Sequence, residues 1–244
     1  MNRERLASFL TEPYPLRLFD SLDSTNSYAK KWAAEGAPQG AAVFAREQTK
    51  GRGRRGRAFC SPPGGLYMSL VVENTPASPG QLTTLAAVAA LEAVAQVTGQ
   101  RLHIKWVNDL LYQGKKVAGI LTEGVIIQGV LAKSVIGIGL NLGPEELPVP
   151  GAGSLYVKGQ PADRERLAAE IMGRILSGLS QAPRHMASYR AHCVNLGQWV
   201  SFEHENQPRA GLAEEIDDEG ALLVKTEEGP LRLIAGEVSL RPRG

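Results

Sequence analysis

The 244-residue sequence has few cysteines, no paired metal ligands and no long apolar run. Cys60 and Cys193 lie far apart, which argues against a disulfide framework and suits a reducing compartment. The four histidines and two cysteines form no His-x-x-x-His or Cys-x-x-Cys pair, so we expect no zinc site built from protein ligands. No apolar run approaches the ~20 residues of a membrane helix, and the N-terminus has no apolar signal core. We therefore expect a cytoplasmic protein that does not bind membranes.

Two common active-site motifs are also missing. The sequence contains neither a Gly-x-Ser-x-Gly elbow nor a Walker-type Gly-x-x-x-x-Gly-Lys-Ser/Thr loop. With 43% hydrophobic and 21% charged residues, the composition is that of an ordinary globular chain. If this protein binds phosphate, another architecture must bind it.

The most unusual segment is residues 50–57, Lys-Gly-Arg-Gly-Arg-Arg-Gly-Arg, which we call the basic loop. Arginines offer forked donors to phosphate or carboxylate oxygens, and glycines let backbone N–H groups approach an anion closely. The loop lies between two apolar segments that are typical of strands, Ala41–Ala45 and Leu66–Val72, so it is a connection inside a domain. The chain carries a net charge of 27 − 25 = +2, which falls to −3 without these five cations. A small-ligand anion site is favoured over a nucleic-acid surface or an unremarkable loop, because nucleic-acid binding usually needs basic residues spread over a face.

The element pattern predicts an α+β fold with a mixed, mostly antiparallel sheet flanked by helices. Helices are expected after Ser24, over Gln81–Thr98, from Asp163 to about Leu179 and near Arg184–His192, the first ending at a glycine. Four strands joined by tight turns follow residue 102, and Leu66–Val72 is expected to alternate between buried and exposed positions.

After Asn195 the pattern changes to five short strands separated by turn residues. About 50 residues with this spacing predict a small β-barrel-like unit. We place the domains at residues 1–195 and 196–244.

A second polar cluster, Lys105-Trp-Val-Asn-Asp109, precedes Lys116-Val-Ala-Gly-Ile-Leu121. Taken alone, Asp109 is explained as the turn residue of a hairpin. Lys116 alone is explained as a charge that protects a strand edge. The two clusters indicate a functional site only when they are considered together with the basic loop.

Together these motifs resemble the biotin protein ligase family. The family motif Gly-Arg-Gly-Arg-Arg-Gly occurs at residues 51–56, and its Lys-Trp-Pro-Asn-Asp motif occurs with Val107 in place of proline. Ser24-Thr-Asn26, Gly137-Ile-Gly-Leu-Asn141 and Gly236-Glu-Val-Ser-Leu-Arg241 match further signatures in the same order. The similarity covers residues 16–242, and only about 15 residues precede the first expected strand, as in a short form without an N-terminal DNA-binding domain.

The resemblance implies a class II synthetase-like catalytic domain and a small C-terminal SH3-like β-barrel. It also implies ATP-dependent ligation of biotin to a lysine of a biotin carboxyl carrier protein. The reaction would proceed through biotinyl-5'-AMP, release pyrophosphate and AMP, and use Mg²⁺. Homodimerisation is common among relatives, and a nucleic-acid partner is not expected.

The resemblance assigns residues to three roles. The biotin-binding candidates are Ser24, Thr25, Asn26, Gln48, Gly51, Arg52, Gly53, Arg54, Lys116, Gly119, Gly137 and Gly139. The ATP-binding candidates are Arg54, Arg55, Arg57, Phe59, Asn108, Asn141 and Arg241. The catalytic candidates are Lys116, Arg54 and Asp109, and Asp109 is also the candidate for Mg²⁺ through phosphate.

Two alternatives remain open at this stage. A lipoate ligase or octanoyltransferase shares the catalytic fold by family resemblance, but its Arg-Arg-x-x-Gly-Gly-Gly motif with a following His-Asp pair is not found. A nucleic-acid-binding module built on the basic loop is the non-enzymatic alternative. Phe59 stands where the family commonly has tryptophan, so we expect weaker retention of the nucleotide.

Overall fold

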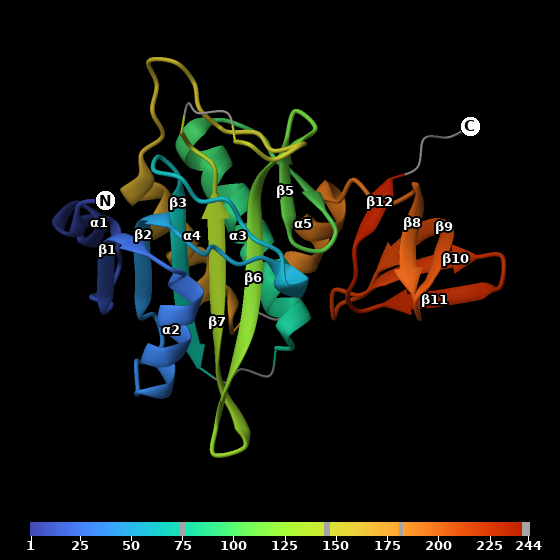
Figure 1. Ribbon diagram of the computed structural model, residues 1–244, viewed down its shortest axis with the longest axis horizontal. Helices are drawn as coiled ribbons and strands as arrows, with labels where there is room; N and C mark the ends of the chain where they lie inside the picture. The colour runs from blue at the N-terminus through green and yellow to red at the C-terminus, as the bar shows by residue number, and fades with distance from the viewer. Residues whose placement is uncertain (74–76, 144–146, 181–182, 241–244) are drawn as a thin grey trace.

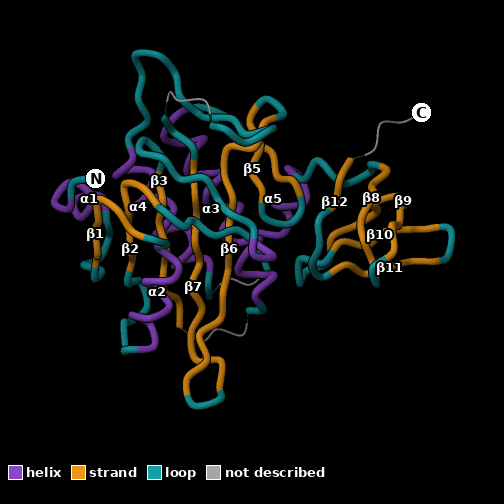
Figure 2. The backbone as a smooth tube through the Cα atoms, in the orientation of Figure 1, coloured by secondary structure: helices purple, strands orange, loops and turns teal. Residues whose placement is uncertain are grey.

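The protein contains a seven-stranded sheet flanked by helices and a separate five-stranded sheet (Figure 1). This computed structural model describes residues 1–73, 77–143, 147–180 and 183–240. The two sheets are well separated along the longest axis of the molecule (Figure 2). The expected α+β class is confirmed.

The large sheet has the strand order β1-β2-β3-β7-β6-β5-β4. Its strands are β1 (Leu16–Leu22), β2 (Ala42–Gln48), β3 (Leu66–Glu73), β4 (His103–Lys105), β5 (Asp109–Tyr112), β6 (Lys115–Ile127) and β7 (Val130–Leu140). β1 and β2 are parallel, while the other neighbours are antiparallel, as the tight turns predicted. β6 and β7 are the longest strands, and their hairpin extends beyond the rest of the sheet (Figure 1).

Five α-helices and a short 3₁₀ turn accompany the large sheet in the described residues. They are α1 (Arg3–Phe9), α2 (Thr25–Ala34), η1 (Arg54–Gly56), α3 (Pro79–Thr98), α4 (Arg164–Gly178) and α5 (His185–His192). The side chains of Ser24, Ser78 and Asp163 cap the starts of α2, α3 and α4, and Gly99 ends α3 in the left-handed conformation. α1 was not predicted, because its seven residues bury only Leu6.

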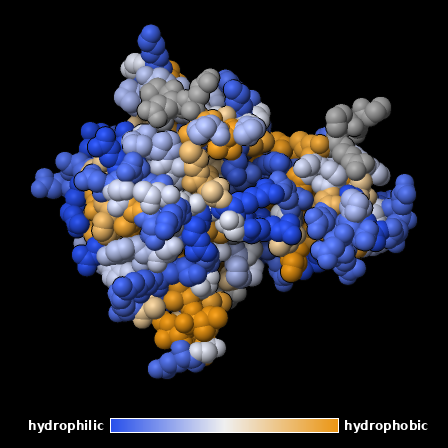
Figure 3. Space-filling view, viewed as in Figure 1, coloured by the Kyte–Doolittle hydropathy of each residue, from blue (hydrophilic) through white to orange (hydrophobic). Residues whose placement is uncertain are grey.

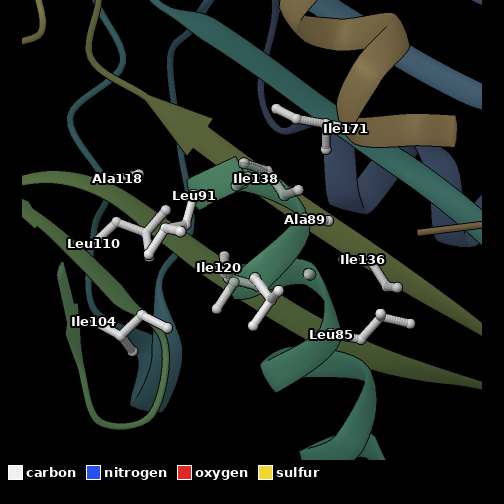
Figure 4. Close-up of a cluster of buried hydrophobic side chains, with 14 of the residues drawn as sticks. Leu85, Ala89, Leu91, Ile104, Leu110, Ala118, Ile120, Ile136, Ile138 and Ile171 are labelled. Atoms are coloured by element: carbon white, nitrogen blue, oxygen red, sulfur yellow. The ribbon is translucent and has the colours of Figure 1, made fainter. Parts of the chain in front are cut away.

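Helices cover both faces of the sheet. On one face α2 packs Ala29 and Ala33 against a cluster that includes Val43 and Val71. On the other face α3 contributes Leu85 and Ala89 to the main core, opposite Ile120 and Ile138 (Figure 4). The alternation expected for β3 is therefore wrong, because its residues 66–72 are buried on both faces.

α3 also corrects the expectation that no apolar run reaches membrane length. Of the described helices, it alone is long and apolar enough to cross a membrane by length and composition. However, 67% of its most apolar window is buried inside the protein, which is the pattern of a core helix.

The C-terminal sheet is antiparallel, with the order β11-β10-β9-β8-β12. Its strands are β8 (Trp199–His204), β9 (Gln207–Ile216), β10 (Leu222–Thr226), β11 (Gly229–Leu233) and β12 (Val238–Leu240). All five predicted strands are present. In the described residues β11 and β12 are the two edges, so hydrogen bonds between strands do not close the barrel.

Hydrogen bonds join the C-terminal sheet to the larger unit. Trp106 Nε1 donates to the carbonyl of Gly220 at 2.9 Å, and Arg190 Nε donates to the carbonyl of Ile216. Asn195 Oδ1 accepts from the Trp106 backbone N–H at 2.8 Å. These contacts fix the small sheet beside the polar cluster at residues 105–109.

Candidate active site

A pocket of about 150 Å³ opens on the large sheet beneath the basic loop. The loop crosses in front of β6 and β7 toward the C-terminal sheet (Figure 1). The predicted residues that line this pocket are Ser24, Thr25, Asn26, Gln48, Arg52, Gly53, Arg54, Arg55, Arg57, Phe59, Asn108, Asp109, Lys116, Gly119, Gly137 and Gly139. The fold thus brings together residues that are more than 100 positions apart in the chain.

Among the described residues, two predicted ones do not line it. Gly51 lies at the base of the loop, where a Cβ would stand 2.2 Å from the Phe59 carbonyl oxygen, so glycine is needed to close the loop. Asn141 donates from Nδ2 to the Gly153 carbonyl at 2.9 Å and borders a neighbouring, smaller pocket. Arg241 lies outside the described residues.

One end of the pocket presents uncharged polar groups. Gln48 Oε1 accepts from the Thr25 backbone N–H at 2.8 Å and lies 3.0 Å from Thr25 Oγ1. Because Oε1 is oriented by that N–H, Gln48 Nε2 donates to Ser61 Oγ at 2.8 Å. Ser24 is buried and caps α2 through a 3.4 Å contact with the Ser27 N–H. This end can recognise a neutral polar ligand group.

The other end is cationic, because Arg54, Arg55, Arg57, Lys105 and Lys116 all line it. In the loop, Arg55 has φ 55° and Gly56 has φ 75°, so the chain turns sharply and directs successive arginines differently. The segment therefore concentrates positive charge at one place.

Arg54 is the most buried of the loop cations. Its Nη1 donates to Asn108 Oδ1 at 3.1 Å, and Asn108 Nδ2 donates to the Ile120 carbonyl at 2.9 Å. Burial lowers the pKa of Arg54 from its ordinary value, while the charge of Asp109 partly offsets this effect. The guanidinium stays a cation in any case.

Lys116 and Asp109 form an ion pair, with Nζ 2.6 Å from Oδ1. Both side chains are partly exposed to the pocket, at 39% and 23%. Asp109 is the first residue of β5, and β6 carries Lys116. An incoming anion can compete for this lysine.

The aromatic ring of Phe59 lies over the bare backbone of β6 and β7. A Cβ at Gly139 would be 2.3 Å from the ring, and one at Gly119 would be 3.0 Å from it. The space beside Gly137 is filled by Asn26, whose Oδ1 would be 2.1 Å from a Cβ. The three glycines thus admit Phe59 and Asn26 against the sheet.

Arg57 is held by a carboxylate of the C-terminal unit. Its guanidinium makes a bidentate ion pair with Glu237, and Gly236, Glu237 and Val238 line the pocket. The pKa of Glu237 is lowered from its ordinary value by hydrogen bonds from Arg57, an effect that burial partly opposes. The small sheet therefore supplies part of the pocket wall.

Sequence analysis missed several residues that organise the site. Lys105 was quoted only as part of a motif, and Glu123, Ser69, Ser61 and Glu237 were not selected. Lys105 and Glu237 could have been inferred, because each lies in a motif that also contains predicted residues. Glu123 and Ser69 carry no local signal, since their side-chain partners are 43 or more positions away. Ser61 contacts Phe59 two residues earlier, but its contact with Gln48 depends on the fold.

No group of three or more His, Cys, Asp or Glu in the described part of the chain could hold a metal ion. A magnesium ion that is bound mainly through substrate phosphates needs only one or two protein carboxylates. Asp109 supplies one in the pocket wall. The donor set therefore suits Mg²⁺ that arrives with a nucleotide.

Comparison with known proteins identifies this architecture. Residues 18–141 match the biotin/lipoate A/B protein ligase family. The chain therefore belongs to that family. Residues 196–241 match the biotin protein ligase C terminal domain, so within the family its similarity is to the biotin protein ligases.

Relatives of known name extend the similarity over most of the chain. The biotin–[acetyl-CoA-carboxylase] ligase of Mycobacterium tuberculosis is 35% identical over 231 residues, which cover 88% of this chain and 85% of that protein. The bifunctional ligase/repressor BirA of Bacillus subtilis is 32% identical, and the match covers 91% of this chain and 72% of BirA. The biotin protein ligase of Aquifex aeolicus, solved with biotin and ATP, superposes with a TM-score of 0.79 at 30% identity and covers 94% and 99% of the two chains.

Proposed function

We propose that this enzyme activates biotin with ATP and transfers it to a lysine of a biotin carboxyl carrier protein. The observation that carries the proposal is a single pocket whose lining combines a hydrogen-bonded set of neutral polar groups around Thr25 and Gln48 with a cluster of cations that includes Lys116 and Arg54. Biotin has a neutral ureido group at one end and a carboxylate at the other, so it matches this polarity. The relatives named as biotin ligases support the same assignment.

The first step joins two anions. The biotin carboxylate attacks the α-phosphate of ATP, the bond to pyrophosphate breaks, and biotinyl-5'-AMP forms. Preorganised cations lower the cost of bringing these charges together. Lys116 is assigned to the carboxylate and the α-phosphate, and Arg54, Arg55 and Arg57 are assigned to the phosphates.

At the neutral end, Ser24, Thr25 and Gln48 are assigned to the ureido group. The Ser24 hydroxyl can donate, and Gln48 Nε2 retains one hydrogen besides that given to Ser61. Arg52 and Gly53 line the adjoining wall and are assigned to the same ligand group. The assignment requires Phe59 to share or vacate the space above Gly119 and Gly139.

Magnesium and the nucleotide are assigned to the β4–β5 turn and the neighbouring loops. Asp109 would hold Mg²⁺ together with phosphate oxygens, and the ion would supply neutralising charge. Asn108 is assigned to the phosphates, and Asn141 is assigned to the adenine from the adjoining pocket. Asn141 Oδ1 is buried and has no hydrogen-bond partner within the described residues, which leaves it able to accept one.

In the second step, the amine of a carrier lysine attacks the biotinyl carbonyl carbon and AMP leaves. The amine must lose a proton, and Asp109 is the carboxylate beside the reacting groups. The basic loop keeps water from the mixed anhydride until the carrier arrives.

The test is a labelling assay with purified protein, Mg-ATP, biotin and a biotin carboxyl carrier domain. We expect one label on the carrier lysine, and we expect biotin to support exchange of radioactive pyrophosphate into ATP. Exchange or labelling that is supported by lipoate in place of biotin would reveal the other activity of the family. Folded protein that supports neither exchange nor labelling with biotin would overturn the proposal, and a salt-sensitive gel shift without turnover would favour nucleic-acid binding.

We also propose that the enzyme forms a homodimer through the β6–β7 hairpin. Ile126 and Val130 are 70% and 63% exposed, and an apolar patch covers the protruding hairpin (Figure 3). Among the described residues, β5 pairs with β6 only as far as Gly119, and β3 pairs with β7 only as far as Lys133. Two copies could continue each other's sheet along these free edges.

Sedimentation velocity tests the dimer. We expect a dimer for the wild type and a monomer for Ile126→Lys. The control is Val149→Lys, at an exposed apolar residue away from the hairpin. A wild-type monomer at a concentration of tens of micromolar would reject the dimer.

A further inference from the structure

Glu123 on β6 lies behind the pocket wall and does not line the pocket. Its side chain is only 16% exposed, yet it faces two cations and an amide. Lys30 Nζ lies 2.9 Å from Oε1, Arg52 Nη2 lies 3.2 Å from the same oxygen, and Asn26 Nδ2 donates to Oε2 at 3.0 Å. Burial alone would raise the pKa of Glu123, but hydrogen bonds from Lys30 and Asn26 with the nearby positive charges lower it. The residue is therefore a carboxylate at neutral pH.

The ion pair with Arg52 anchors the start of the basic loop. Arg52 is 48% exposed, so the pair alone contributes little to the stability of the fold. Arg52 also lines the pocket, so the pair restricts where this wall residue can lie. Glu123 thus affects loop position more than global stability.

A second connection runs from Glu123 through buried side chains to the end of the same loop. Asn26 Oδ1 lies 2.6 Å from Ser69 Oγ, and Ser69 Oγ lies 2.8 Å from Thr25 Oγ1. Thr25 contacts Gln48 Oε1, and Gln48 Nε2 donates to Ser61 Oγ. Ser61 Oγ then donates to the Phe59 carbonyl at 3.0 Å. We call this series from Asn26 to Phe59 the polar relay.

The Glu123 carboxylate fixes the direction of hydrogen bonding at Asn26, the first residue of the polar relay. Asn26 Nδ2 donates one hydrogen to Glu123 and the other to the Leu121 carbonyl, at 3.1 Å from the latter. Its oxygen must therefore face Ser69, and the Ser69 proton must point to it, because an amide oxygen can only accept. A neutral amide at position 123 can offer a donor to Asn26, which would remove one of the two acceptors that hold Nδ2 and leave only the Leu121 carbonyl. With the Ser69 proton committed to Asn26, Ser69 Oγ can only accept from the Thr25 hydroxyl. The charge at Glu123 thus determines the direction of the Thr25 hydroxyl at the pocket, while the Thr25 backbone N–H orients Gln48.

We propose that Glu123 is a positioning residue for biotin recognition, which acts through Arg52 and through the polar relay. The inference rests on the proposed function, because it assumes that the groups ordered by Glu123 receive biotin. Ser69, which is fully buried, transmits the effect from Asn26 to Thr25. Lys30 neutralises Glu123 but belongs neither to the relay nor to the pocket lining.

The test compares biotin affinity, measured by titration calorimetry without ATP, in Glu123→Gln, Ser69→Ala, the double variant and Lys30→Gln. Glu123→Gln is expected to weaken binding about tenfold, the scale of one charge-assisted hydrogen bond. Ser69→Ala should weaken it several-fold, which is the scale of a neutral hydrogen bond. The double variant should lose less than the product of the two single effects, because both substitutions interrupt one relay. Lys30→Gln should stay within about twofold of the wild type, although it removes a charge from the same carboxylate.

The measured affinities either support or reject the positioning role of Glu123. Equal affinity for Glu123→Gln and wild type overturns the inference, as do single effects that simply multiply in the double variant. If Lys30→Gln weakens binding as much as Glu123→Gln, Glu123 serves the ion-pair cluster in general and the inference is also rejected. Ser69→Ala keeps the relay testable should Glu123→Gln not fold, since loss of affinity in Ser69→Ala supports the relay and wild-type affinity rejects it. A wild-type protein that binds no biotin contradicts the proposed function instead.

Discussion

The role proposed for Lys116 is in the chemistry of the pocket, and its ion pair adds little to the stability of the fold. Its ion pair with Asp109 is partly exposed, and such pairs stabilise proteins by about 0–1 kcal/mol. Its neighbour Lys115 is exposed and points away from the pocket lining. The two adjacent lysines therefore form a matched pair for mutation.

Lys116→Ala is expected to slow pyrophosphate exchange about a hundredfold, as removal of one group that stabilises transition-state charge does elsewhere. Its melting temperature should stay near that of the wild type. Lys115→Ala serves as the control and should retain the wild-type exchange rate. Equal rates in Lys116→Ala and the wild type would remove Lys116 from the mechanism.

The basic loop is fixed at three points by residues from three different elements. Arg52 pairs with Glu123 of β6, Arg54 binds Asn108, and Arg57 pairs with Glu237 of the C-terminal unit. Loops are usually more mobile than the elements they connect, and these contacts keep the basic loop over the pocket. Loss of one contact should weaken closure before it affects chemistry.

Arg54→Gly should release activated biotin from the pocket. We expect biotin on lysines of a bystander protein that lacks a carrier sequence, detected by mass spectrometry. Arg101→Gly is the control, because Arg101 is an exposed arginine outside the pocket lining. Bystander labelling no higher in Arg54→Gly than in Arg101→Gly would show that Arg54 does not retain the adenylate.

Several features of the loop and core could be predicted from sequence because their causes are local. Glycine and arginine spacing identified the loop, capping residues located the starts of α2 and α4, and an apolar run that stops at Gly99 located α3. The pairing of Glu123 and Glu237 with loop arginines could not be predicted, because the partners are 71 or more positions apart in the chain. The burial of β3 on both faces also depended on two helices that sequence periodicity does not assign to a particular strand.

At the scale of the whole molecule, the turn after β9 joins the two units. Asp217 accepts from the backbone N–H groups of Glu219 and Ala221 and from Arg232 Nε. The same turn offers the Gly220 carbonyl to Trp106, whose motif lines the pocket. Burial tends to raise the pKa of Asp217, but the Ala221 N–H and Arg232 lower it below its ordinary value.

The lowered pKa predicts how stability depends on pH. A carboxyl with a depressed folded-state pKa stabilises the fold at pH above its unfolded value of about 3.9, and the effect disappears as pH falls through the folded value. Asp217→Asn should therefore reduce the free energy of unfolding by about 1 kcal/mol at pH 7 and much less at the acid end. Urea unfolding at both pH values checks this, with the exposed Asp20→Asn as the control. The prediction would be contradicted if Asp217→Asn lowered the free energy of unfolding by the same amount at pH 7 and at acid pH.

Residues 236–238 of the C-terminal unit form part of the pocket wall, so both units contribute to the candidate active site. An exchange of C-terminal units between relatives would therefore exchange the carboxylate that pairs with Arg57, the arginine that we assign to the phosphates. In hybrid enzymes joined near residue 195, the turnover should depend on both parents. The residues at positions 57 and 237 should be taken from the same parent so that their ion pair is kept.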